Sequence, residues 1–291
     1  MKRFSILFLT FIVCINLFGC AQPLSGEILA TTLPVYEFTK IICKDTGLTV
    51  TQLISENVSC LHDYTLQVSQ MQAIENASVI VSSGAGLEDF LTDVLSGAQK
   101  IVDASTGISL LCGFHDHEAH EHAHTDEYDP HIWLSVANAK QMAYNIYLEL
   151  SAQYPQYQTL FEKNLADLNA EFSQLDQYAS SALSNLSQTQ LITFHDGFCY
   201  LADSYGLEII HAVEEESGSE ASAQELIALI ELVKEYNLQA IFTEEYGSSS
   251  AASVISAETG VPIYTLDMAI SGDSYFDAMY HNINTLKEAL Q

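Results

Sequence analysis

Two series of short β-branched runs, each alternating with helical segments, constrain the fold of this chain more than any other feature. The first series predicts strands at 28–32, 48–54, 79–83 and 101–103, with helices at 35–44, 65–76 and 88–95. The second predicts strands at 190–194, 207–213, 240–243 and 261–266, with helices at 197–205, 222–236, 248–259 and from 274 onward. A βαβα order predicts a parallel sheet covered by helices. We therefore expect an α/β fold of two lobes, each with a mainly parallel β-sheet flanked by helices.

The segment between the two series is helical in character. From 137 to 186 it has almost no glycine and a single proline, Pro155, and its apolar positions recur with a helical period. This pattern predicts a long rigid helix joining the lobes, or two helices in succession. We accordingly divide the chain into an N-terminal lobe (27–135), a connecting helix (136–187) and a C-terminal lobe (188–291).

The first residues have the pattern of a targeting segment. Lys2 and Arg3 precede an apolar stretch at 4–18, which is shorter than the roughly 20 residues of a membrane-spanning helix. The stretch ends in Leu-Phe-Gly-Cys, which resembles the bacterial lipobox, in which the cysteine becomes the acylated N-terminus. We expect a lipoprotein signal peptide at 1–19, lipidation of Cys20 and a tether at 20–26; a plain signal peptide ending in Cys is the alternative. The protein would then be exported and lipid-anchored at the outer face of the bacterial cell membrane.

The charge balance narrows the class of ligand. The chain has 38 Asp and Glu residues against 9 Lys and Arg residues, a formal net charge of −29, while 48% of its residues are hydrophobic. Such apolar content excludes disorder of the highly charged kind. The few basic residues are dispersed, which excludes a nucleic-acid partner. The acidic composition and the ten histidines indicate a cation as the ligand instead.

Half of the histidines fall in one short loop, which we place at 113–128. Five imidazoles alternate there with acidic residues, a composition suited to weak, exchangeable cation binding. These histidines are His115, His117, His120, His122 and His124.

The cysteine spacings match no zinc or redox signature. Export would permit a disulfide, and Cys60 and Cys112 both follow predicted strands and could approach each other. We favour that pair over one that includes Cys43.

Four other residues are candidate ligands of a primary metal site. His62, His195 and Asp267 follow predicted strands, where open parallel sheets bind ligands, and His131 precedes the connecting helix. Three imidazoles and one carboxylate suit a closed tetrahedral Zn²⁺ site bridging the lobes. Their spacing alone does not establish the site, because no local pair such as HxxxH is present. A three-histidine zinc hydrolase, with Asp267 as general base, is the enzymatic alternative.

Several motifs in order make the chain similar to a known family over essentially all of 27–291. It resembles the metal-binding lipoproteins of ABC importers, the zinc and manganese solute-binding family. The motifs are TLPVY (32–36), HDY (62–64), SGAGLE (83–88), DPHIWLS (129–135), HDGFCYLA (195–202), IFTE (241–244) and TG (259–260). Val136 departs from the family pattern, which usually has proline at that helix start.

The resemblance implies a function and a ligand set. It implies a non-enzymatic receptor, a monomer, that hands its ion to an ABC permease and its ATPase; a surface adhesin is a further alternative. The family's ligand positions fall on His62, His131, His195 and Asp267, with Asp273 as a rival to Asp267. Three imidazoles favour Zn²⁺ over Mn²⁺, which remains the alternative.

Acidic residues beside the candidate histidines could hold the rings in place. Asp63, Asp129 and Asp196 each adjoin one of them in the sequence. A carboxylate can orient a ligating imidazole by accepting its second N–H.

Overall fold

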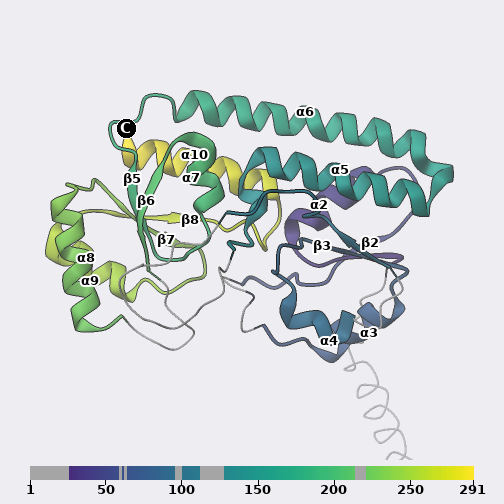
Figure 1. The fold of residues 1–291 in the computed structure, drawn as a ribbon, viewed down its shortest axis with the longest axis horizontal. Coiled ribbons are helices and arrows are strands. Elements are labelled where there is room, and N and C mark those ends of the chain that lie inside the picture. Colours follow the sequence, from purple (N-terminus) through teal and green to yellow (C-terminus); the bar gives the residue numbers. More distant parts are fainter. Residues whose placement is uncertain (1–25, 59–60, 62–63, 96–99, 112–127, 214–220) are drawn as a thin grey trace, which may run out of the picture.

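The computed structural model describes residues 26–58, 61, 64–95, 100–111, 128–213 and 221–291. It confirms the expected α/β fold: two four-stranded sheets, all of whose strand pairs are parallel, each have helices on both faces (Figure 1). The two sheets have the same strand order, β2-β1-β3-β4 in the first lobe and β6-β5-β7-β8 in the second. In each sheet the strand order therefore reverses between the two central strands, which are β1 and β3 in the first lobe and β5 and β7 in the second. We call this position the crossover point.

The N-terminal lobe follows the predicted order closely. Its strands are β1 (Ile28–Ala30), β2 (Val50–Gln52), β3 (Val79–Ser82) and β4 (Ile101–Asp103). Its helices are α2 (Leu33–Ile42), α3 (Val68–Asn76), the 3₁₀ turn η1 (Asp89–Leu91) and α4 (Thr92–Leu95). Helix α2 begins two residues earlier than predicted, because Pro34 fits the first turn of a helix, where its missing N–H costs nothing.

The C-terminal lobe repeats this arrangement. Its strands are β5 (Gln190–Thr193), β6 (Glu208–Ala212), β7 (Ile241–Glu244) and β8 (Ile263–Leu266). Its helices are α7 (Cys199–Tyr205), α8 (Ala223–Glu235), α9 (Ser250–Thr259) and α10 (Tyr275–Leu290). Helices α8 and α9 cover one face of the sheet, and α7 and α10 cover the other (Figure 1).

Two helices in succession, not one, occupy the segment between the lobes. After the 3₁₀ turn η2 (Ile132–Leu134), α5 (Val136–Gln153) packs against the N-terminal lobe. A turn at η3 (Pro155–Tyr157) reverses the chain, and α6 (Gln158–Ala182) then runs along both lobes (Figure 1). Helix α6 is thus the long connecting helix. Among the described residues, no helix is both long and apolar enough to cross a membrane.

The larger of two apolar cores among the described residues contains side chains from both lobes. Phe38 of α2 packs edge-on against Phe172 of α6 and Tyr275 of α10, with ring centroids 5.1 and 5.0 Å apart. All three rings are fully buried. Because these helices belong to the N-terminal lobe, the connection and the C-terminal lobe respectively, the cluster fixes how the lobes sit relative to one another.

Polar contacts reinforce the same boundary. The Leu33 N–H donates to the carbonyl of Ile270 at 3.1 Å, which joins the start of α2 to the loop that follows β8. Glu37, also on α2, accepts hydrogen bonds from the Tyr275 N–H and the Ser274 hydroxyl, at the N-terminus of α10. The N-terminal lobe therefore supplies an acceptor for the otherwise unpaired amide at the start of a C-terminal-lobe helix.

We expect Phe172→Ala to lower the free energy of unfolding by about 3–5 kcal/mol, because it leaves a cavity where three helices meet. Chemical denaturation followed by circular dichroism measures the change. Glu171→Ala, at the exposed neighbouring position on α6, is the control and should stay within about 0.5 kcal/mol of the wild type. Equal effects of the two substitutions would contradict a shared core at this point.

Candidate metal site

The carboxylate of Asp129 holds His131 in place. The Asp129 Oδ1 atom lies 2.8 Å from both the backbone nitrogen and the ring Nδ1 of His131. Because a carboxylate oxygen accepts, Nδ1 carries a proton, and in the neutral imidazole this leaves the lone pair on Nε2. Both residues are buried, with 2% of their surface exposed. The structure thus shows the contact with this imidazole that was predicted for Asp129, while its role at a metal site stays a prediction.

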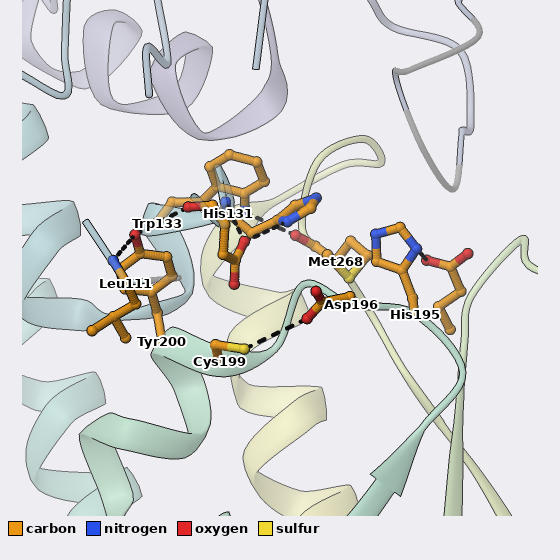
Figure 2. Close-up of polar contacts among 10 residues, drawn as sticks. Leu111, His131, Trp133, His195, Asp196, Cys199, Tyr200 and Met268 are labelled. Atoms are coloured by element: carbon orange, nitrogen blue, oxygen red, sulfur yellow. Dashed lines mark hydrogen bonds and ion pairs between the residues drawn. The ribbon is translucent and has the colours of Figure 1, made fainter. Parts of the chain in front are cut away.

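The segment around His131 is fixed by both lobes. The Tyr200 hydroxyl on α7 donates to the Asp129 carbonyl at 3.0 Å and accepts from the Leu111 N–H at 2.9 Å. Trp133, fully buried, donates from its indole N–H to the Met268 carbonyl at 2.8 Å. Figure 2 shows these contacts converging on the turn that bears His131.

His195 comes from the other lobe and faces His131. It follows β5, the first strand of the C-terminal lobe, and its ring centroid lies 5.3 Å from that of His131, with the ring planes 80° apart. In Figure 2 the two rings are neighbours, and one nitrogen of His195 points toward the His131 ring. The structure thus brings together two of the four predicted ligands, one from each side of the lobe boundary.

Gly197 allows the two imidazoles to come this close. A Cβ atom at this position would lie 2.5 Å from Met268 Cε, 2.8 Å from His131 Nδ1 and 2.9 Å from His195 Cδ2. Real Cβ contacts are essentially never shorter than 3.0 Å. A residue larger than glycine would therefore displace one or both rings.

Glu244 is the carboxylate beside His195, and the sequence interpretation assigned it no role. Its Oε2 atom lies 3.6 Å from His195 Nδ1. The side chain is only 8% exposed, and burial raises the pKa of its carboxyl to about 8. The feature that could have pointed to Glu244 is its position at the end of β7, because β7 pairs directly with β5, the strand that precedes His195. Asp196, by comparison, accepts a hydrogen bond from the Cys199 thiol at 3.6 Å.

Asp267 lies at the end of β8, in a loop held by its own backbone. Its Oδ1 atom accepts the Ala269 N–H at 2.7 Å, and buried Asn282 bonds both its N–H and its carbonyl at 2.7 Å. Burial raises the pKa of the Asp267 carboxyl, and the Ala269 hydrogen bond partly offsets that effect. The rival acid Asp273 is exposed and lines a groove along α2.

Several predicted features lie outside the described residues. They are the signal peptide, Cys20, His62, Asp63, the Cys60–Cys112 pair and the five histidines of the 113–128 loop. Within the described part of the chain, no three His, Cys, Asp or Glu residues are grouped so that they could hold a metal ion. The site visible here is therefore a facing pair of imidazoles, and a complete ligand set remains a prediction.

Two α/β lobes that present imidazoles to each other across a shared boundary define the class of two-lobed solute-binding proteins. A solved structure of ZnuA superposes with a TM-score of 0.80 at 29% identity, covering 91% of this chain and 100% of that one. The Zn(II)-bound ZnuA-like domain of Streptococcus pneumoniae AdcA superposes with a TM-score of 0.76 at 30% identity, covering 91% and 99%.

Sequence comparison then identifies the family. The model of the zinc-uptake complex component A family, ZnuA, matches residues 28–289, and the chain belongs to this family. The zinc-binding lipoprotein AdcA of Streptococcus pneumoniae is 31% identical over 99% of this chain, which spans only 61% of that relative's length. A putative metal-binding protein of Treponema pallidum is 32% identical over 78% of this chain and 76% of that protein's length.

We expect Gly197→Ala to weaken zinc binding by about tenfold or more, because the new methyl group displaces imidazoles that must be held precisely. Isothermal titration with Zn²⁺ measures the change. Gly206→Ala is the control: Gly206 has a positive φ of 69° but nothing within 4 Å of its added Cβ. It should cost stability through backbone strain and leave zinc affinity unchanged. Zinc affinity that is unchanged in Gly197→Ala would contradict the role of this glycine.

Proposed function

We propose that this chain is the extracytoplasmic zinc-binding component of an ABC importer. It captures Zn²⁺ between its lobes and delivers the ion to a membrane permease driven by an ATPase. The observation that carries this proposal is the pair formed by His131 and His195, two imidazoles from opposite lobes with ring centroids 5.3 Å apart. The zinc-uptake family to which the chain belongs, and a relative whose name is zinc-binding lipoprotein, support it.

The full ligand set that we propose is His62, His131, His195 and Asp267. Three imidazoles and one carboxylate form a closed tetrahedral shell for Zn²⁺, a borderline ion that accepts both nitrogen and oxygen ligands. A site with two acids would suit Mn²⁺ better. Four protein ligands leave no position for a reactive water, so the proposed site binds and releases an ion without a chemical step.

The cellular location that we propose rests on the signal-peptide pattern of the first residues. We propose that Cys20 is lipidated and that the protein acts as a monomer, anchored at the outer face of the bacterial cell membrane. Relatives named as lipoproteins support the anchor. The histidine-rich loop at 113–128 would collect cations near the anchored surface, at lower affinity than the site between the lobes.

The central test is a competitive Zn²⁺ and Mn²⁺ titration of the metal-free protein, with and without residues 115–124. We expect one tight zinc site per chain, preference for zinc over manganese, and persistence of that site after the loop is deleted. His131→Ala should abolish tight binding, because it removes one of four ligands. Loss of all tight binding on deletion of the loop would show that the primary site lies in the loop.

A second test separates the rival acids. Asp267→Asn keeps an oxygen that can accept the Ala269 N–H, so the loop should keep its shape while the negative charge is lost. We expect this variant to bind zinc at least about tenfold more weakly, whereas the exposed control Asp273→Asn should match the wild type. The reverse ranking would assign the fourth ligand to Asp273.

A further inference from the structure

Each of the two facing imidazoles has a buried carboxylate at its Nδ1 atom. For His131 the carboxylate is that of Asp129, at 2.8 Å. For His195 it is that of Glu244, at 3.6 Å. In both cases the contact engages the same ring nitrogen, and in Figure 2 the other nitrogen of His195 points toward the His131 ring. Each lobe thus places a buried carboxyl group beside the Nδ1 atom of its imidazole, at 2.8 Å in one lobe and 3.6 Å in the other.

We infer that Glu244 is the positioning residue of His195: it accepts the Nδ1 proton and thereby directs the Nε2 lone pair toward the metal. This inference rests on the proposed function. An imidazole that ligates through one nitrogen almost always donates its other N–H to a carboxylate, a carbonyl or water, and this contact fixes both tautomer and ring orientation. At 3.6 Å the two groups lie just beyond hydrogen-bond distance, and we expect the contact to shorten to a hydrogen bond when zinc binds Nε2.

The fold holds the Glu244 side chain in this place. Glu244 is the last residue of β7, the strand that pairs with β5 next to His195. Gly247 also lies against the side chain: a Cβ there would be 2.4 Å from Glu244 Cγ and 2.7 Å from Oε1. Within the described residues, the Oε2 atom is buried and makes no hydrogen bond. His195 Nδ1 is thus the ring donor that this oxygen faces.

A positioning role is distinct from ligation. Oε2 lies on the Nδ1 side of the His195 ring, whereas the ring nitrogen that faces His131 lies on the Nε2 side. A metal held between the two Nε2 atoms would therefore have the His195 ring between itself and Glu244. Removing the carboxylate should weaken binding without removing an atom from the coordination shell.

The test compares Glu244→Gln, Glu244→Ala and the control Glu231→Gln, which makes the same side-chain replacement at an exposed position on α8 of the same lobe. Zinc affinity is measured in the full chain by competition with a fluorescent chelator. We expect about hundredfold weaker binding for Glu244→Ala, an intermediate loss of about tenfold for Glu244→Gln, which keeps an acceptor oxygen, and wild-type affinity for Glu231→Gln. The ring ¹⁵N chemical shifts of His195 should show the Nδ1–H tautomer in the zinc-loaded wild type and a mixture of tautomers in Glu244→Ala.

Two results would overturn the inference. One is a Glu244→Gln protein that binds zinc within twofold of the wild type. The other is X-ray absorption that shows one oxygen ligand fewer in Glu244→Gln, which would make Glu244 a ligand. Gly247→Ala should weaken binding as well, by pushing the carboxylate away, and it serves if Glu244→Ala does not fold. A wild-type chain without tight zinc binding would refute the proposed function itself, which is a different outcome.

Discussion

The burial of Trp133 between the lobes is the constraint on which the rest of the structure depends. Its indole N–H donates to the Met268 carbonyl in the C-terminal lobe, and its own carbonyl accepts the Tyr275 hydroxyl at 2.9 Å. A buried donor or acceptor without a partner costs about 1–3 kcal/mol, so these contacts hold the turn of residues 132–134 in one position. His131 lies immediately before this turn. The position of one imidazole relative to the other is therefore set by the packing between the lobes.

The two lobes share one strand order but use the crossover point differently. In the N-terminal lobe, buried Glu88 fills this point: its carboxylate accepts the Thr31 hydroxyl at 2.6 Å and the N–H groups of Ser83 and Gly84 at 2.7 and 3.0 Å. Burial raises the pKa of this carboxyl, and the three donors partly offset that effect. In the C-terminal lobe, the equivalent edge places His195 and Glu244 at the lobe boundary. The crossover point of the N-terminal lobe is thus filled by Glu88, whereas at that of the C-terminal lobe side chains are placed where a ligand could bind.

The sequence predicted what depends on local pattern. Alternating β-branched runs and helical periods located the eight strands of the described residues to within two residues at each end, since those signals lie within each segment. His131 and His195 were found from their positions and motifs. Glu244 was missed because its contact with His195 depends on β5 and β7 being neighbours, which is a matter of strand order. Likewise, nothing in the sequence shows that Gly197 lies against two imidazoles from different lobes.

The contacts across the boundary also limit how a metal ion could reach the proposed site. The loop after β8 is bonded to the N-terminal lobe or its connection through Met268, Ile270 and the start of α10, and α6 runs along both lobes. A wide hinge opening would break these hydrogen bonds and expose the Phe38–Phe172–Tyr275 cluster to water. The net stability of a domain is about 5–15 kcal/mol, so the free energy lost in such an opening would be a large fraction of it. The structure therefore favours entry by local movement of loops over separation of the lobes.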